Sequence, residues 1–221
     1  MSKKSVAIVA AYNEAATIAD VLRPLIASPL VAEVIVVSDG STDETVTIAK
    51  QQGARVIDLP KNGGKGAAML AGVAATDAAV LLFVDADLRG FDATHIEGLL
   101  RPVLEGARVM NVGMRDRGAW LHPIVSHLPL ISGERAMKRA VIEGIHPRFL
   151  QDFKVESALN YHCRQSGLAY GTVFMRGVRI RRKWEKVGLA RSVIQYLRTI
   201  FEVSFAMTTV RLAALFGRFP S

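Results

Sequence analysis

The first half of the chain alternates short apolar runs with segments of helical periodicity, and this alternation constrains the fold most strongly. The runs are rich in Val and Ile and lack the regular polar positions of a strand with one face in water. Runs of this kind, separated by helices, are typical of strands buried on both faces of a mostly parallel sheet. The sequence therefore predicts an α/β fold, with strands at 6–11, 31–38, 55–59, 79–85 and from 107, and helices at 17–26, 43–52, 65–75 and 93–104.

The regular alternation ends at Arg115, so the second half is organised differently. Residues 116–188 combine loops and helices with one or two strands within 169–178, and residues 189–216 read as one mostly apolar helix. With 221 residues and 50% hydrophobic side chains, the chain is long enough for one sizeable core without disulfides. We expect one domain over 1–188 and a C-terminal helical appendage over 189–221.

The predicted C-terminal helix is amphipathic and carries Arg198, Glu202 and Arg211. Each charge at the centre of a bilayer costs about 2.5 to 3.5 kcal/mol on insertion scales, so we do not expect this helix to span a membrane. It fits a core helix, a homodimer interface or a helix that lies on a membrane surface, and the sequence leaves these three alternatives open.

The formal net charge of +8 indicates an anionic partner such as a nucleotide, a phosphorylated substrate, acidic lipid or nucleic acid. Charge alone does not choose among these. Cys163 is the only cysteine, so the chain forms no internal disulfide. The apolar run before Tyr12 is too short for the core of a secretory signal peptide, and we expect a cytoplasmic protein.

Two acids end the strand predicted at 79–85 and form the sharpest motif. Asp85 and Asp87 are separated only by Ala86. Open α/β sheets bind ligands outside the carboxyl ends of their strands, so both acids are expected at the binding rim. Repulsion between like charges would raise one pKa unless a cation lies between them, and Mg²⁺ or Mn²⁺ bound with a diphosphate resolves this conflict. The alternative is a turn with two solvated acids.

Two further motifs follow strands and open helices. In "SDGSTDET" (38–45), Asp39 stands where a carboxylate suits a ribose or base edge, although these Ser and Asp residues also suit a helix N-cap. In "KNGGKGAAM" (61–69), backbone amides and Lys65 suit phosphate, although a flexible turn with a solvated lysine explains the same residues. Together the motifs favour a nucleotide at this rim.

Four motifs in chain order, "AAYNEAATI", "VSDGSTDET", "NGGKGAA" and "FVDADL", resemble the family 2 glycosyltransferases with a GT-A fold. They look most like the branch of polyprenyl-phosphate sugar transferases and glucosyl-3-phosphoglycerate synthases. The resemblance implies a Rossmann-like, mostly parallel central sheet flanked by helices. It also implies a nucleotide-sugar-binding half over 1–115 and an acceptor-side half over 116–188.

The resemblance implies roles for residues of the donor side. Ala11, Tyr12 and Glu14 would border the base and ribose of a nucleotide-diphosphate sugar. Asp39 would hydrogen-bond the base or ribose, and Lys65 would lie near the nucleotide or the sugar.

By the same resemblance, Asp85 and Asp87 would hold Mg²⁺ or Mn²⁺ together with the donor diphosphate. Related enzymes often have Gln soon after the second acid, whereas this chain has Arg89, and a cation there cannot ligate metal. Asp92 or a residue far down the chain is the alternative third ligand.

The acceptor side has a fainter likeness. "ISGERAMKR" (131–139) resembles a segment that would place Ser132, Gly133 and Arg135 at the acceptor, with Arg135 as the candidate for its phosphate. The alternative is a helix start in which Ser132 caps the first turn and Glu134 favours the helix dipole.

"DFKVESALNYH" (152–162) resembles the segment that ends in a carboxylate at the acceptor pocket, which makes Glu156, with Asp152 behind it, the catalytic candidates. A hydroxyl acceptor needs a general base, whereas a phosphate acceptor is already anionic at neutral pH and needs none. In the basic stretch after Val178, Arg181, Arg182 or Lys183 would bind the leaving diphosphate, as a similarly placed basic residue does in related enzymes, and Arg182 is the candidate among them. The alternatives are that this stretch is solvated or contacts anionic lipid.

The sequence thus predicts a metal-dependent glycosyltransferase that moves a sugar from a nucleotide-diphosphate sugar to an acceptor, preferably a phosphorylated one such as polyprenyl phosphate or a small phosphorylated acid. We expect no nucleic-acid partner, and peripheral contact with the inner membrane face and homodimerisation through the C-terminal helix stay open. The alternatives are a nucleotidyltransferase, which would need a Gly- and Arg-rich triphosphate loop near residue 12, and a non-catalytic nucleotide-sugar-binding or scaffold protein.

Overall fold

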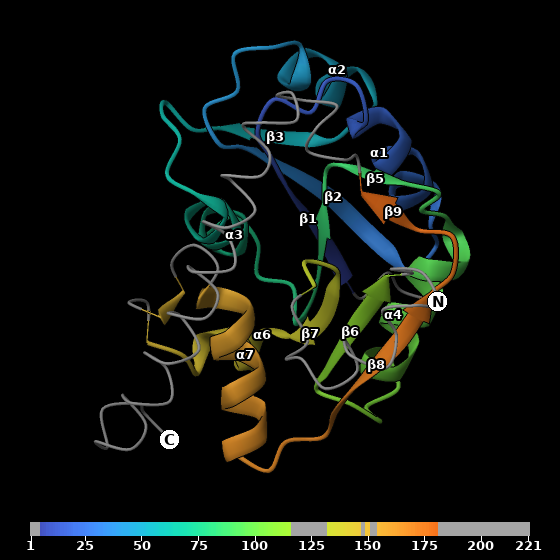
Figure 1. The fold of residues 1–221 in the computed structure, drawn as a ribbon, viewed down its shortest axis with the longest axis vertical. Helices are drawn as coiled ribbons and strands as arrows, with labels where there is room; N and C mark the ends of the chain where they lie inside the picture. The colour runs from blue at the N-terminus through green and yellow to red at the C-terminus, as the bar shows by residue number, and fades with distance from the viewer. Residues whose placement is uncertain (1–4, 116–131, 147–148, 151–153, 181–221) are drawn as a thin grey trace, which may run out of the picture.

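The computed structural model describes residues 5–115, 132–146, 149–150 and 154–180. These residues form a seven-stranded sheet with helices on both faces and a separate two-stranded sheet, β5-β9 (Figure 1). The strands are β1 (Ser5–Ala11), β2 (Val31–Ser38), β3 (Arg55–Asp58), β4 (Val80–Asp85), β5 (Leu88–Arg89), β6 (Met110–Arg115), β7 (Arg135–Lys138), β8 (Tyr170–Met175) and β9 (Arg179–Ile180). The helices are α1 (Ile18–Ala27), α2 (Thr45–Gln51), α3 (Lys65–Ala74), α4 (Ala93–Leu104), α6 (Arg139–Glu143) and α7 (Lys154–Gln165).

The strand order in the large sheet is β3-β2-β1-β4-β7-β6-β8. The pairs among β1, β2, β3 and β4 are parallel, and β6 and β8 are also parallel, whereas β7 runs antiparallel to both β4 and β6. The chain moves outward from β1 to β2 and β3, and α3 then returns it to β4 on the other side of β1. This reversal between β1 and β4 creates the switch point at which open α/β sheets bind ligands.

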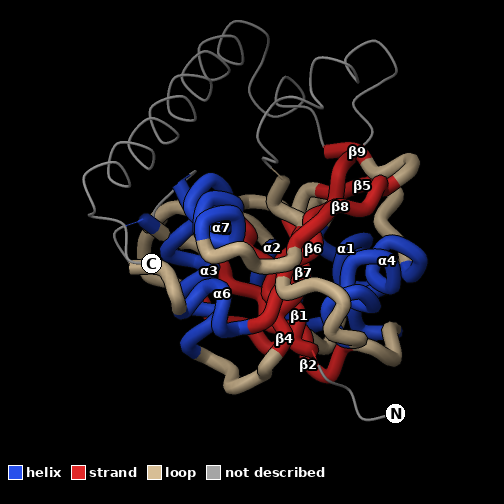
Figure 2. Tube along the Cα trace, turned by 90° about the horizontal axis from the view of Figure 1, so that it is seen from below, coloured by secondary structure: helices blue, strands red, loops and turns tan. Residues whose placement is uncertain are grey.

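Apolar side chains fill both faces of the sheet and fix its layers. On β4, Leu82 and Val84 belong to the core beneath α1 and α4. Leu81 and Phe83 belong to the core beneath α3, α6 and α7. Figure 2 shows these two groups of helices on opposite sides of the strands. Because alternate residues of a strand face the same side, Asp85 at the end of β4 continues the face that α3 and α7 cover.

The predicted α/β architecture is confirmed. The strand at 31–38 and the helix at 93–104 have the predicted bounds, and the other predicted elements of the first half agree to within two residues, except the strand expected from 107. That strand, β6, begins at Met110, because Arg108 N–H donates to the Pro102 carbonyl and closes the turn after α4 first.

The alternative of a helix start at 132–135 is wrong, because β7 begins at Arg135 and α6 only at Arg139. Ala136 packs in one core and Met137 in the other, and only an extended strand presents neighbouring residues to opposite faces. The predicted C-terminal helix and the boundary at 188 lie outside the described residues.

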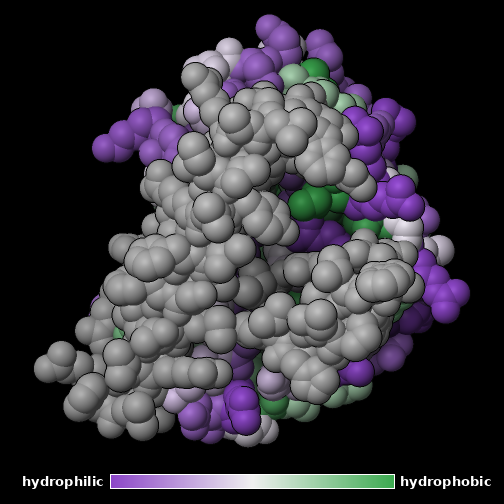
Figure 3. Space-filling view, viewed as in Figure 1, coloured by the Kyte–Doolittle hydropathy of each residue, from purple (hydrophilic) through white to green (hydrophobic). Residues whose placement is uncertain are grey.

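In the space-filling view, hydrophilic side chains gather over α1 and α2 (Figure 3). Within the described ranges, no helix combines the length and the apolar character that crossing a bilayer would require.

Candidate active site

The carboxyl ends of β1, β2 and β4 lie side by side and bring the motif residues to one rim. Ala10 is paired with Asp85, and Ala11 with Ser38, so the loops after these strands start at the same level. Asp39 N–H also donates to the Ala11 carbonyl at 2.8 Å, which extends the β1–β2 pairing by one residue. Parallel strands therefore assemble residues that are far apart in the sequence.

Asp85 lies at the centre of a cluster of charges. Lys65 Nζ is 2.7 Å from its Oδ1, and Arg115 Nη2 is 3.6 Å from its Oδ2. Burial alone would raise the pKa of Asp85, but the Lys65 ammonium and the Arg115 guanidinium outweigh burial and hold this pKa at about 2. Gly133 lies against the same carboxylate, since a Cβ on Gly133 would be 2.1 Å from Oδ1. Asp85 is therefore an ionised carboxylate that Gly133 closes on one side.

Arg115 and Glu134 belong to this cluster, although the sequence reasoning gave neither a role in the site. Arg115 Nε is 3.1 Å from Glu134 Oε2, and Ser132 Oγ donates to the same oxygen at 2.6 Å. Burial and the Asp85 carboxylate raise the pKa of Glu134 to about 7, against the opposing effect of Arg115. Arg115 stands at the end of a predicted strand, as the other rim residues do. This position was the sequence feature that could have indicated its role.

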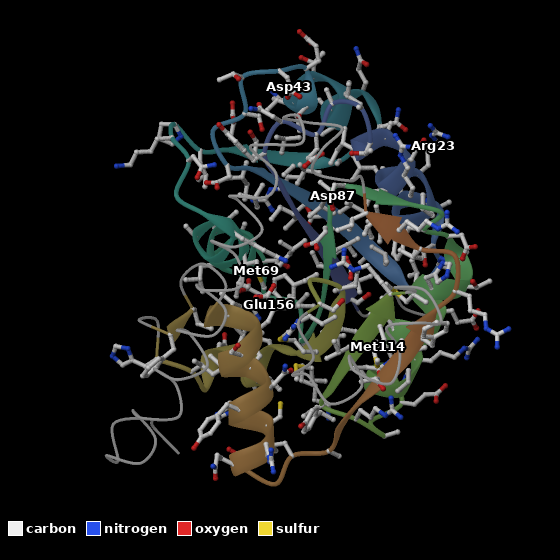
Figure 4. The ribbon with its side chains drawn as sticks, in the orientation of Figure 1. Arg23, Asp43, Met69, Asp87, Met114 and Glu156 are labelled. Atoms are coloured by element: carbon white, nitrogen blue, oxygen red, sulfur yellow. The ribbon has the colours of Figure 1, made fainter. Side chains whose placement is uncertain are left out.

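Lys65 connects Asp85, at the end of β4, to α7. Its Nζ donates to Glu156 Oε1 at 3.0 Å while it also contacts Asp85. Burial would lower the pKa of Lys65, but the charges of Asp85 and Glu156 raise it above its ordinary value. Figure 4 shows Glu156 at the start of α7 and Asp87 in the turn after β4. The predicted residues Lys65, Asp85 and Glu156 are thus brought together.

Arg135 lies inside the fold, between Phe83 of β4 and Val112 of β6. Its side chain is fully buried, and its Nε and Nη2 both donate to the Ser132 carbonyl, at 3.2 and 2.6 Å. This burial argues against the prediction that Arg135 meets an acceptor phosphate. The guanidinium instead fixes the turn that presents Gly133 to the rim.

Asp39 holds the glycine-rich loop in place. Gly63 N–H donates to its Oδ1 at 2.7 Å, and Gly64 N–H donates to its Oδ2 at 2.9 Å. Gly64 has a φ of 86°, a left-handed conformation that glycine adopts without steric cost, and α3 begins at the next residue. The Asp39 carboxylate is only 4% exposed. Its contact with a base or ribose stays a prediction, since here both oxygens organise the loop that carries Lys65.

The turn after β1 is fixed by contacts with the loop after β2. Asn13 has a φ of 55°, and its Oδ1 accepts a hydrogen bond from Thr42 N–H at 2.8 Å. Tyr12 is 48% exposed, so its ring is available to a ligand. Glu14 is buried, and Thr17 Oγ1 donates to its carboxylate at 3.3 Å. Of the predicted base-binding side chains, Tyr12 is thus the accessible one, while Glu14 shapes the turn.

Asp87 lies in the turn after Asp85 and is half-buried. Burial would lower the pKa of Arg115, but the charges of Glu134 and Asp85, and then that of Asp87, raise it. The two acids supply the oxygen donors that Mg²⁺ and Mn²⁺ prefer, which fits a metal shared with a diphosphate. No cluster of three or more His, Cys, Asp or Glu side chains that could hold a metal occurs in the described part of the chain.

Asp92, considered as a third ligand, caps α4. Its Oδ1 accepts hydrogen bonds from Thr94 N–H at 2.9 Å and His95 N–H at 3.3 Å. The Thr94 hydroxyl, which also donates to Asp92, lowers the pKa of this acid together with the backbone amide of His95. The predicted site residues Asp152 and Arg182 lie outside the described residues.

Comparison of the sequence with known proteins identifies its family. The model of "Glycosyl transferase family 2" matches residues 6–144. A glucosyl-3-phosphoglycerate synthase of Mycobacterium tuberculosis is 36% identical over 115 residues, which are 48% of this chain and 35% of that protein. A 4,4'-diaponeurosporenoate glycosyltransferase of Staphylococcus aureus is 35% identical over 98 residues, which are 42% of this chain and 26% of that protein. The matched regions thus span only 35% and 26% of the length of these two curated relatives.

The fold is also found among solved structures. The crystal structure of glucosyl-3-phosphoglycerate synthase from Mycobacterium tuberculosis, in complex with Mn²⁺, UDP-glucose and phosphoglyceric acid, aligns with a TM-score of 0.71 at 25% identity. The alignment covers 95% of this chain and 80% of that one. The family match extends over more than half of the chain and includes every strand from β1 to β7, so this chain belongs to glycosyl transferase family 2.

Proposed function

We propose that this chain is a metal-dependent glycosyltransferase that transfers a sugar from a nucleotide-diphosphate sugar to a phosphorylated acceptor. One observation carries the proposal: the pairing of Lys65 with both Asp85 and Glu156 joins the motif side of the sheet to α7 at the switch point. A sugar nucleotide bound at this rim would lie beside both carboxylates. The relative crystallised with Mn²⁺, UDP-glucose and phosphoglyceric acid supports the same classes of ligand here.

The donor side is built to bind a nucleoside diphosphate. Tyr12 offers an exposed ring to the base, and Asp39 sets the loop from which Lys65 reaches the diphosphate. Asp85 and Asp87 would hold Mg²⁺ or Mn²⁺, which when bound offsets the charge that builds up on the leaving diphosphate. Gly133 keeps the Asp85 carboxylate in one position, and Lys65 and Arg115 keep it ionised.

The acceptor side is basic where an anion would approach. Arg115 replaces Arg135 as our candidate for the acceptor phosphate, because its side chain is 14% exposed at the rim whereas Arg135 is fully buried. A phosphate acceptor attacks as an anion, so Glu156 would orient it rather than deprotonate it. With a hydroxyl acceptor, Glu156 would accept the proton as general base. The choice between the two roles depends on the acceptor.

Titration calorimetry with UDP- and GDP-sugars, in the presence and absence of Mn²⁺, tests the proposal. Donor binding that requires Mn²⁺ supports the enzyme, and hydrolysis of the bound donor identifies its sugar. Absence of binding to every nucleotide sugar would favour the scaffold alternative. Preference for nucleoside triphosphates over nucleotide sugars would favour a nucleotidyltransferase.

Two finer parts of the prediction concern regions outside the described residues. The basic stretch after Ile180 and the helix predicted from the sequence at 189–216 are proposed to contact an anionic membrane surface or a second copy of the chain. Sedimentation of the full chain with vesicles of anionic lipid, compared with vesicles of neutral lipid, tests the first. Sedimentation velocity without lipid tests the second.

A further inference from the structure

One ammonium group neutralises two carboxylates from distant parts of the chain. Lys65 Nζ lies 2.7 Å from Asp85 Oδ1 and 3.0 Å from Glu156 Oε1. Asp85 ends β4 on the proposed donor side, and Glu156 lies in the first turn of α7 on the proposed acceptor side. Lys65 itself opens α3, directly after the loop that Asp39 holds. It is therefore a direct link between the two sides.

The two carboxylates depend on Lys65 to different degrees. Asp85 has a second cation, Arg115, at 3.6 Å. The Glu156 side chain is 3% exposed, and its Oε2 has no hydrogen-bond partner among the described residues. The Arg115 and Arg135 guanidiniums act on Glu156 only through space. Because a buried carboxylate without partners is costly, the bond from Lys65 fixes Glu156 in its present position.

A bound donor would change this arrangement. A diphosphate carries more negative charge than one carboxylate, and the flexible stem of a lysine lets its ammonium follow the stronger charge. We propose, on the basis of the function proposed above, that Lys65 is a positioning residue that leaves Glu156 for the donor diphosphate, and that donor binding thereby frees Glu156 to engage the acceptor. The free protein keeps Glu156 occupied until the donor is present.

This competition has a measurable consequence. If Glu156 and the diphosphate compete for one ammonium, removal of the Glu156 charge must tighten nucleotide binding, since coupling between two sites is reciprocal. If the Lys65–Glu156 ion pair were only structural, removal of the Glu156 charge would weaken nucleotide binding or leave it unchanged. The effect must also shrink when Lys65 is absent, because the remaining shared cation, Arg115, acts on Glu156 only through space.

Calorimetry of UDP with Mn²⁺ on four full-length proteins tests the inference: the parent, Glu156→Gln, Lys65→Met and the double variant. We expect Glu156→Gln to tighten UDP binding by about threefold or more, and to change it by less than about twofold when Lys65→Met is already present. Lys65→Arg keeps the charge, so Glu156→Gln should still tighten binding in that background. Glu143→Gln removes an exposed carboxylate of α6 that pairs with Arg139, and it controls for net charge.

Unchanged or weaker UDP binding in Glu156→Gln would overturn the inference, as would equal tightening with and without Lys65. A control variant Glu143→Gln that tightens binding as much as Glu156→Gln would also overturn it. If Lys65→Met does not fold, as circular dichroism would report, the comparison of Glu156→Gln with Glu143→Gln still decides. If the parent protein does not bind UDP or GDP with Mn²⁺, the proposed function itself is rejected. If the parent binds but Glu156→Gln does not tighten binding, only the inference about Lys65 is rejected.

Discussion

Gly133→Ala is the most direct test of the site geometry. A Cβ at this position would lie 2.1 Å from Asp85 Oδ1 and 2.3 Å from Oδ2, whereas ordinary contacts begin at 3.4 Å. The carboxylate must therefore move by about 1.3 Å, or the Ser132–Glu134 turn must move away from it. Gly133 is not among the glycines with positive φ, so an alanine meets no backbone strain and the whole effect comes from this contact. Overpacking of this kind costs about 1 to 3 kcal/mol.

This displacement of Asp85 should lower donor turnover more than it lowers the free energy of unfolding. Asp85 would be pushed out of its 2.7 Å contact with Lys65, and a misplacement of about 1 Å at a reacting centre costs on the order of 100-fold in rate. Donor turnover and Mn²⁺-dependent UDP affinity should be measured on Gly133→Ala, with unfolding in urea to report stability. Gly98→Ala on α4, where a Cβ would lie 3.2 Å from Val173, provides the matched control. Gly133→Ala with parental turnover and UDP affinity would refute the role of Asp85 as a carboxylate held in one position.

Asp87→Asn should abolish Mn²⁺-dependent turnover while circular dichroism shows an intact fold, and near-normal activity would count against the metal assignment. Asp39→Ala should lower the free energy of unfolding by about 2 to 4 kcal/mol, because two amide hydrogen bonds to a buried carboxylate are lost, and urea unfolding that shows no change would contradict this. The pKa of Glu134 is raised from 4.5 to about 7, so the folded state binds its proton more tightly and stability should fall as pH rises from about 4.5 to about 7. Glu134→Gln should remove most of that slope, and an unchanged slope in urea unfolding would exclude Glu134 as its source. Arg115→Met should raise the KM for a phosphorylated acceptor more than that for the donor, and equal effects on both would argue against acceptor binding.

The sequence predicted the elements of the first half well, because local periodicity carries that information. Apolar runs such as 34–38 are buried on both faces, and each run ends in polar residues that the parallel arrangement gathers at one rim. The acid pair after β4 and the glycine-rich loop followed from the same reasoning. Their order in the chain was enough to indicate the family that the comparison then showed.

The sequence was less informative about the role of each side chain. Arg135 lies in a motif that suggested an acceptor contact, but its burial follows from β7, which pairs antiparallel with both β4 and β6. Asp39 was predicted as a ligand contact, yet its oxygens accept the amides of a loop 24 and 25 residues later. Neither contact leaves a periodic or compositional trace, because each depends on a partner that is distant in sequence.

What the sequence determined by itself is the alternation of strands and helices, the face that each strand residue takes and hence the rim where the acids lie. Hydrogen bonds and hydrophobic burial within short segments are sufficient for that. Only the tertiary structure decided that Arg115 and Glu134 join Asp85, and that Lys65 lies between Asp85 and Glu156. Charge interactions depend on distance in space, and that distance is set by how β6, β7 and α7 pack onto β4.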